Sequence, residues 1–175
     1  MAGPADVGRL AELARTAIAE LAPTRGGAVW RAREARTEPV EATLEPLIGL
    51  DGALVLAGTI DDVIVGYAVA RQEVLPDGTR LGVVDDVFVE EGAREVGVGE
   101  AMIDQVIDWC RQAGCFGIDA MVLPGHRAAK NFFEESGFTA RKLVMHKPLA
   151  GAAGTADVGS AGAAGAADAG PADEA

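Results

Sequence analysis

A glycine pair is the first place in this chain where residue types and spacing could support chemistry. Gly97 and Gly99 stand in residues 94–100, between a strand-like run and a long helical one. Glycines at a strand-to-helix turn let backbone N–H groups converge without Cβ atoms in the way, and a helix N-terminus adds about half a positive charge behind them. The segment predicts an anion site, most simply for a pyrophosphate, although such glycines can also serve only to turn the chain.

The neighbouring sequence predicts the elements that must hold this turn. Residues 81–89 are rich in β-branched and aromatic side chains, which is typical of a strand. Residues 97–113 carry apolar side chains at helical spacing, and Gly114 is placed to end that helix. The glycine pair is therefore expected where a strand turns into a helix.

The strand-like runs before the turn predict an antiparallel meander. Residues 53–57 and 63–70 are separated by the turn-rich spacer 58–62, which is consistent with a hairpin. A second turn signal at residues 76–78, Pro-Asp-Gly, leads into residues 81–89. Three consecutive antiparallel strands follow from this order.

Helical patterns precede the meander. Residues 7–21 have the spacing of an amphipathic helix that ends before Pro23, and residues 43–48 form a second, shorter helical region. These segments are expected to pack against the body of the domain.

The elements after the long helix are predicted as strand, helix and strand. Residues 116–123 are reached through a helix and should therefore run parallel to the strand before it. Residues 126–135 are helical and end at Gly137, and residues 139–149 return as a last strand. The antiparallel meander argues against a dinucleotide-binding domain, which needs repeated βαβ units.

Composition sets the domain boundary and limits the partners. Residues 150–175 are almost entirely Ala, Gly, Asp, Ser, Thr and Pro and have too little apolar bulk to fold, so we expect one domain at residues 1–149 and a disordered tail. With 27 acidic against 15 basic residues, the net charge of −12 argues against nucleic acid or an anionic membrane as partner. The two cysteines give no disulfide framework, no metal site is predicted, and without a leader or a long apolar run we expect a cytoplasmic protein.

Three blocks of the sequence resemble the GCN5-related N-acetyltransferase (GNAT) superfamily. Arg94, Gly97 and Gly99 match its acetyl-CoA signature, which is Arg or Gln, two residues, Gly, one residue, then Gly or Ala. Residues 84–89 look like the fourth strand of the family, and residues 129–138 look like its C-terminal helix ending in Gly-Phe. The resemblance covers roughly residues 50–149.

The resemblance implies an α/β fold of mixed α+β type, that of the GNAT-like acyl-CoA N-acyltransferases. A central mixed sheet, flanked by helices, would be splayed between strands 4 and 5, with acetyl-CoA in the gap. The substrate would approach from the opposite side, between the first helices and the strand at 139–149. Main-chain groups of 87–89 would pair with the pantetheine arm like an added strand, and the amides of 96–100 would hold the pyrophosphate together with Arg94. The implied cofactor-binding residues are Val87, Phe88, Val89, Arg94, Glu95, Val96, Gly97, Val98, Gly99, Glu100, His126 and Phe133.

Asp85 and Asp86 are the catalytic candidates under this resemblance. Acetyl transfer needs a neutral amine, and one of these carboxylates could accept the amine proton directly or through water. Alternation along a strand should send the two side chains to opposite faces. Both could instead be solvated or hydrogen-bonded structural acids.

Two positions in the last helix depart from or extend the family pattern. Phe133 stands where a tyrosine often donates a proton to the departing thiolate, and phenylalanine cannot donate one. His126 stands where the family often has an asparagine that contacts the cofactor, although a capping or surface histidine is the alternative. Near the phosphate loop, Glu95 and Glu100 would each reduce pyrophosphate affinity by ~1 kcal/mol through like-charge repulsion.

These observations predict an acetyl-CoA-dependent N-acetyltransferase that acts on a primary amine, of a small molecule or a peptide, by direct attack. The alternative is an acyl-CoA-binding regulatory module of the same fold with little or no catalysis, which Phe133 and the acidic loop favour. The sequence leaves open a homodimer.

Overall fold

The computed structural model describes residues 1–149, of which Met1–Met145 form one compact unit. The segment predicted to be a disordered tail, residues 150–175, lies outside the described residues, so the boundary at 149 stays a prediction. In the described part of the chain, no helix is both long enough and apolar enough to cross a membrane.

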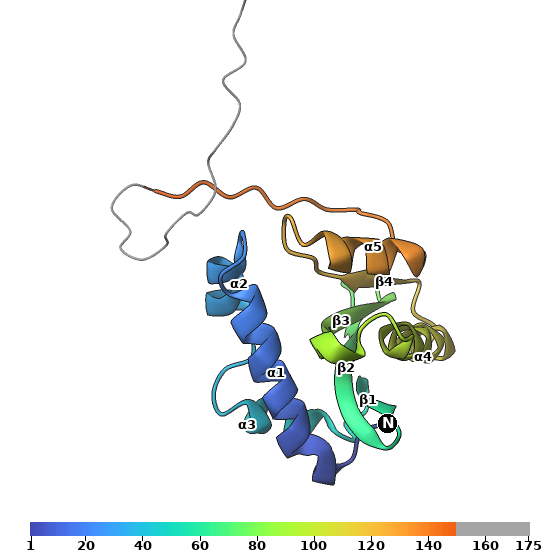
Figure 1. Ribbon diagram of the computed structural model, residues 1–175. Helices are drawn as coiled ribbons and strands as arrows, with labels where there is room; N and C mark the ends of the chain where they lie inside the picture. The colour runs from blue at the N-terminus through green and yellow to red at the C-terminus, as the bar shows by residue number, and fades with distance from the viewer. Residues whose placement is uncertain (150–175) are drawn as a thin grey trace, which may run out of the picture. The chain divides into compact units, whose positions relative to one another are not determined.

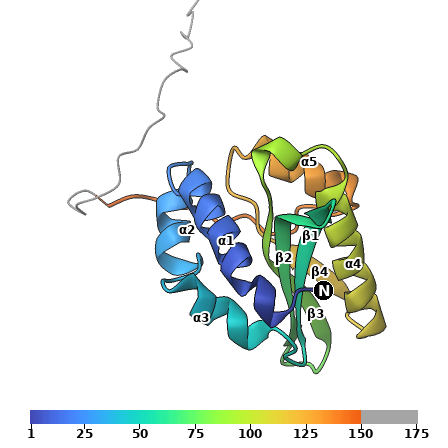
Figure 2. The ribbon, with the colours of Figure 1, turned by 60° about the horizontal axis from the view of Figure 1, so that its bottom comes forward.

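The centre of the unit is a mixed sheet (Figure 2). Strands β1 (Ala53–Ile60), β2 (Val63–Val74) and β3 (Arg80–Val89) pair antiparallel in sequence order, and β4 (Gly117–Ala120) pairs parallel with β3. The predicted meander and the parallel strand after the long helix are both confirmed.

Helices cover both faces of this sheet (Figure 1). Helices α1 (Val7–Leu21), α2 (Gly27–Arg33) and α3 (Val40–Leu44) lie on one side, and α4 (Val98–Gln112) lies on the other. Helix α5 (Arg127–Glu135) follows β4, and three short 3₁₀ turns cover Pro4–Asp6, Glu45–Leu47 and Glu91–Ala93. The helix predicted at 7–21 is confirmed at both ends. The apolar side chains that predicted it form its buried face.

Two buried clusters, one on each face, hold these layers together. The cluster on the α1 face contains Leu10, Leu13, Val40, Leu44, Val55, Tyr67, Val69 and Phe88, among others. The cluster on the α4 face contains Leu54, Leu56, Ala68, Ala70, Val84, Met102, Ile103, Val106, Cys110 and Phe133. Alternating residues of β1 and β2 divide between the two clusters, as expected for a sheet covered on both faces.

The ladder between β3 and β4 is short. It pairs Leu81–Val84 with Gly117–Ala120 and ends there, while β3 continues to Val89. The sheet is therefore splayed, as the resemblance implies, and the split lies here between the third and fourth strands of the described sheet.

The predicted last strand is wrong. Residues 139–149 have no regular secondary structure, and the apolar side chains that favoured a strand, Leu143, Val144 and Met145, are 80%, 70% and 83% exposed. Residues of strand-like composition form a strand only when a neighbouring strand pairs with them, and composition alone cannot supply that neighbour. Residues 139–149 therefore do not form the strand that was expected to line one side of the substrate site.

Candidate functional site

The second half of β3 directs main-chain groups into the split. The Glu90 N–H donates to the Val65 carbonyl of β2 at 2.9 Å. Because successive residues of a strand direct their N–H and C=O groups to alternate sides, those of Val87 and Val89 point away from β2. The Val89 carbonyl accepts a hydrogen bond from Arg94 Nε at 2.8 Å, which agrees with this direction. The main-chain segment predicted to bind an extended ligand therefore borders the split.

The turn after β3 has the backbone of an anion site. Glu95 and Gly97 have φ of 65° and 89°, and Gly97 is the N-cap of α4 with no side-chain cap. The Ala101 N–H donates to the Gly97 carbonyl, so the amides of Val98, Gly99 and Glu100 are the free donors of the first turn. The predicted convergence of amides at a helix N-terminus is thus present.

Gly99 sits against another element. A Cβ there would lie 3.1 Å from Phe132 Cε2 and 3.8 Å from Val89 Cγ2. Glycine at this position therefore lets the start of α4 approach α5 and the end of β3 closely. A large side chain at Gly99 would push α5 away, so such a variant tests packing together with phosphate binding.

Arg94 lies beside the split, held by three groups. Besides its bond to the Val89 carbonyl, its Nη2 pairs with Glu20 of α1 at 2.8 Å, and its guanidinium carbon lies 5.4 Å from the centre of the Phe88 ring. Its side chain and that of Glu20 are 42% and 44% exposed, so the ion pair is open to solvent. The residue predicted to bind pyrophosphate is thus near the loop, and Glu20 competes for its charge.

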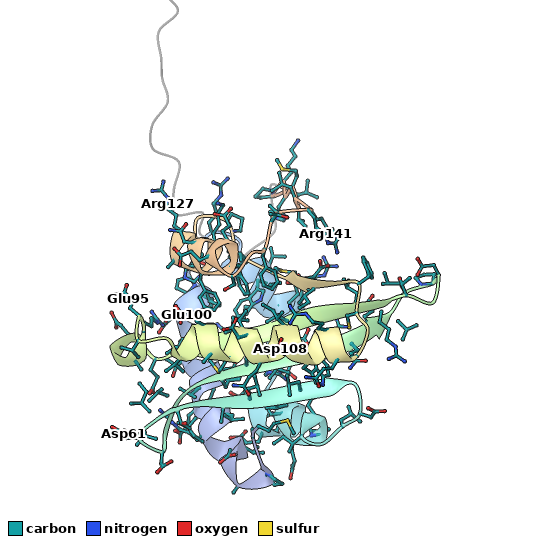
Figure 3. All side chains as sticks on the ribbon, turned by 90° about the vertical axis from the view of Figure 1, so that its right-hand side faces the viewer. Asp61, Glu95, Glu100, Asp108, Arg127 and Arg141 are labelled. Atoms are coloured by element: carbon teal, nitrogen blue, oxygen red, sulfur yellow. The ribbon has the colours of Figure 1, made fainter. Side chains whose placement is uncertain are left out.

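Glu95, Val96 and Glu100 lie on the outside of the turn. Val96 is 64% exposed, and Figure 3 shows Glu95 and Glu100 beside the N-terminal end of α4. The same view places Arg127, at the start of α5, on that side of the molecule. The predicted like-charge repulsion toward a phosphate remains a prediction.

A β-bulge at Asp85 changes the expected directions of the two carboxylates. Val69 pairs with Asp86 and Ala70 with Val84, so Asp85 is the extra residue. Asp86 accepts a hydrogen bond from Tyr67 and Asp85 accepts one from Arg71. Tyr67 and Arg71 are four residues apart in regularly paired β2 and share a face. The predicted opposite orientation is therefore wrong, because a bulge interrupts alternation.

Asp86 is held by groups from two elements. Arg36, in the connection between α2 and α3, donates from Nε at 2.9 Å and also from Nη2 to the same Asp86 oxygen, Oδ2. Tyr67 Oη donates to the other oxygen, Oδ1, at 3.1 Å. Tyr67 is buried. Its pKa is raised well above 10, mainly by burial and next by the negative charge of Asp86, so the phenol remains a hydrogen-bond donor.

Asp85 has a different environment. Its side chain is 33% exposed and meets the half-exposed Arg71 at 3.2 Å. Partial burial raises the pKa of Asp85 above its ordinary value of 3.8, while the positive charges of Arg71 and Arg36 oppose that rise. A carboxylate of raised pKa, beside the point where the β3–β4 ladder ends, is suited to accept a proton.

His126 and Phe133, both implied to contact the cofactor, lie in different environments. His126 is an exposed N-cap of α5 and makes no side-chain cap hydrogen bond. Phe133 is buried in the α4-face cluster, and its ring centre lies 5.2 Å from those of Phe132 and Phe138. Phe133 is therefore a packing residue here, and its proposed contact with a cofactor stays untested.

The partners of Asp86 and Arg94, which are Arg36 and Glu20, were not predicted from the sequence. Arg36 and Glu20 carry no local signal, since they contact residues 50 and 74 positions away.

Two surface hollows, of about 370 and 310 Å³, lie around Trp109 and the start of β1 and contain none of the predicted site residues. Among the described residues, no three His, Cys, Asp or Glu side chains are grouped to hold a metal ion.

Comparison with known proteins gives a matching family and a similar relative. The acetyltransferase (GNAT) family matches residues 17–138. An aminoglycoside N(6′)-acetyltransferase type 1 from Stenotrophomonas maltophilia is 30% identical over 127 residues, which is 66% of this chain and 80% of that protein.

Solved structures share the fold. The BH1408 protein from Bacillus halodurans, solved as a tetramutant, superposes with a TM-score of 0.72 at 20% identity over 85% of this chain and 97% of that chain. A ribosomal-protein-alanine N-acetyltransferase from Brucella melitensis superposes with a TM-score of 0.60 at 19% identity over 85% and 96%.

Proposed function

Because this chain belongs to the acetyltransferase (GNAT) family and is an N-acetyltransferase, we propose that it transfers the acetyl group of acetyl-CoA to a primary amine by direct attack. The observation that carries this proposal is the release of β3 from β4 after Val84. It leaves the main-chain groups of Val87 and Val89 directed away from β2, next to the amide donors at the start of α4.

Residues along the split fit an acyl-CoA co-substrate. An extended pantetheine arm carries amides that pair with a strand edge, as the main-chain groups of Val87 and the N–H of Val89 provide. The pyrophosphate suits the amides of Val98–Glu100 at the positive end of α4, joined by Arg94 once its contact with Glu20 opens. Binding in the split therefore uses main chain for the arm and a helix N-terminus for the charge.

Asp85 is the proposed general base. It accepts a proton from the ammonium form of the acceptor, directly or through water; the neutral amine nitrogen then attacks the thioester carbonyl carbon, the C–S bond breaks, and the second amine proton passes to solvent. The CoA thiolate leaves and takes a proton from solvent, since Phe133 has no proton to give. Asp86 serves a structural purpose instead, because both of its oxygens already accept hydrogen bonds from Arg36 and Tyr67.

The proposed acceptor is a cationic amine of a small molecule or peptide. The relative from Stenotrophomonas maltophilia acetylates an aminoglycoside amine by its name, and the net charge of −12 on this chain attracts cations. Amino sugars and short basic peptides are therefore the first compounds to assay.

Two measurements test the proposal. Calorimetric titration should show acetyl-CoA binding, and a panel of aminoglycosides and basic peptides assayed for free CoA thiol should show transfer dependent on both substrates. Binding of acetyl-CoA with no thiol release from any amine would favour the non-catalytic binding module. Absence of acetyl-CoA binding would contradict the proposed site.

A further inference from the structure

One largely buried arginine, Arg36, links the connection between α2 and α3 to strand β3. Arg36 and Asp86 have side chains only 11% and 18% exposed, whereas the other ion pairs of the described residues are more open. The Arg36 guanidinium also donates from Nη1 to the carbonyl and hydroxyl oxygens of Thr43 in α3, at 3.1 and 3.3 Å. One side chain thus joins β3, its own loop and α3.

The position of this contact relates it to the proposed base. Asp86 follows Asp85 directly in the bulge, and the charge of Arg36 reaches Asp85 as well. The groups that face Asp85 electrostatically are Arg71 of β2, Asp86 of β3 and Arg36. Movement of Arg36 would therefore change both the wall beside the bulge and the charge around the base.

We propose that Arg36 is a positioning residue for the amine acceptor, fixing the α2–α3 connection against the β3 bulge through Asp86 and Thr43. The inference rests on the proposed function. It assigns the α2–α3 connection to the acceptor side of the site, where the first helices were expected to lie. Arg36 acts through Asp86 and the loop and does not itself touch the reacting atoms.

Arg36→Gln tests the proposal against Arg15→Gln as a matched control. Arg15 of α1 also contacts this connection, pairing with Glu38 at 2.9 Å and with Glu41 of α3 at 2.7 Å, but has no contact with β3 among its hydrogen bonds. We expect Arg36→Gln to raise the KM for the amine about tenfold and to leave acetyl-CoA affinity within about twofold. Arg15→Gln should leave both quantities within about twofold.

Two further variants separate positioning from stability. Arg36→Gln alone leaves Asp86 half-buried without its cation, which lowers the melting temperature, and adding Asp86→Asn removes that unpaired charge. The double variant should regain melting temperature and keep the raised amine KM. Arg36→Lys should give an intermediate KM, because an ammonium cannot bridge Asp86 and Thr43 as the planar guanidinium does.

The pH profile adds a readout that a structural role would not move. Loss of the Arg36 charge raises the pKa of Asp85 further, so the acidic limb of kcat/KM should shift to higher pH in Arg36→Gln but not in Arg15→Gln. An amine KM that is unchanged in Arg36→Gln, equally raised in Arg15→Gln, or restored together with stability in the double variant would overturn the inference.

Failure of the proposed function can be told apart from failure of this inference. Wild-type protein that acetylates no amine overturns the former. Hydrogen exchange then tests the latter without turnover, since Arg36→Gln should speed exchange of the amides of 40–44 and of the bulge by about tenfold. Exchange that stays as in wild type would overturn the placement of the connection.

Discussion

The two halves of β3 share one neighbour and differ in the other. From Leu81 to Val84 the strand pairs with β2 on one side and β4 on the other. From Asp86 to Val89, beyond the bulge at Asp85, it pairs only with β2 in the described sheet. The first half is an interior strand and the second has the free main-chain groups of an edge strand, although both belong to one continuous element.

This difference explains how a stable sheet can offer a binding surface. The ladder to β4 ends next to the bulge at Asp85, which turns two consecutive carboxylates toward the same face of β2. The half that pairs on both sides positions the strand, and the half without β4 presents N–H and C=O groups to the proposed ligand. A site of this kind needs few specific side chains along the arm of its ligand.

The largest effect should come from the carboxylates at the junction of the two halves. Asp85→Asn should lower kcat/KM by ~10²-fold, the lower range for loss of a general base, with acetyl-CoA affinity near its wild-type value. Asp86→Asn should act mainly on the amine KM and on thermal stability. Steady-state kinetics with both substrates varied separates these outcomes, and a larger kcat loss in Asp86→Asn would reverse the assignment.

A smaller effect is expected at the loop that follows the free half. Gly97→Ala forces a side chain into a left-handed conformation that costs about 1–2 kcal/mol, so the loop should relax and acetyl-CoA affinity should fall roughly tenfold. Gly92→Ala is the control, because a Cβ there also meets open space and its φ is ordinary. Equal affinities of the two variants by calorimetry would show that the loop conformation is unimportant.

The ion pair that holds Arg94 should give a change of opposite sign. Glu20→Gln frees Arg94 for the pyrophosphate and removes a nearby negative charge, so the Kd for acetyl-CoA should decrease about threefold, as an exposed pair allows. Glu12→Gln, which removes a glutamate of α1 paired with Arg9, should leave the Kd unchanged. A weaker Kd in Glu20→Gln would mean that Glu20 helps to orient Arg94.

The smallest change should be a shift in pH dependence. Burial raises the pKa of Asp85 and Arg71 opposes that rise, so Arg71→Gln should raise the pKa further. A base is active when deprotonated, so the acidic limb of kcat/KM should move to higher pH while the plateau is kept. If the acidic limb of kcat/KM does not move in Arg71→Gln, Asp85 is not the group whose ionisation sets that limb.

Local patterns predicted the elements that carry the candidate site. The apolar spacing of residues 7–21 gave α1 with its observed bounds, because burial of one face and helix formation agree there. The glycine pair and the strand before it located the turn into α4, because a positive φ at Gly97 is a local requirement.

Features that depend on distant partners were missed. Residues 58–60, which resemble turn residues, belong to β1, and the turn is the pair Asp61 and Asp62 with φ of 48° and 63°. Gly58 is needed because a Cβ there would lie 2.6 Å from Val98 Cγ1 of α4. The bulge at Asp85 and its contact with Arg36 depend on tertiary pairing in the same way, which one sequence does not show.

Hydrogen exchange along β3 with and without acetyl-CoA tests the central claim most directly. Leu81 and Val83, in the half that pairs on both sides, should show no ligand-dependent change. The amides of Val87 and Val89 should exchange at least about tenfold more slowly with acetyl-CoA bound, because they become donors to the pantetheine arm. Saturating acetyl-CoA that leaves both amides at their free rates would contradict binding in the split.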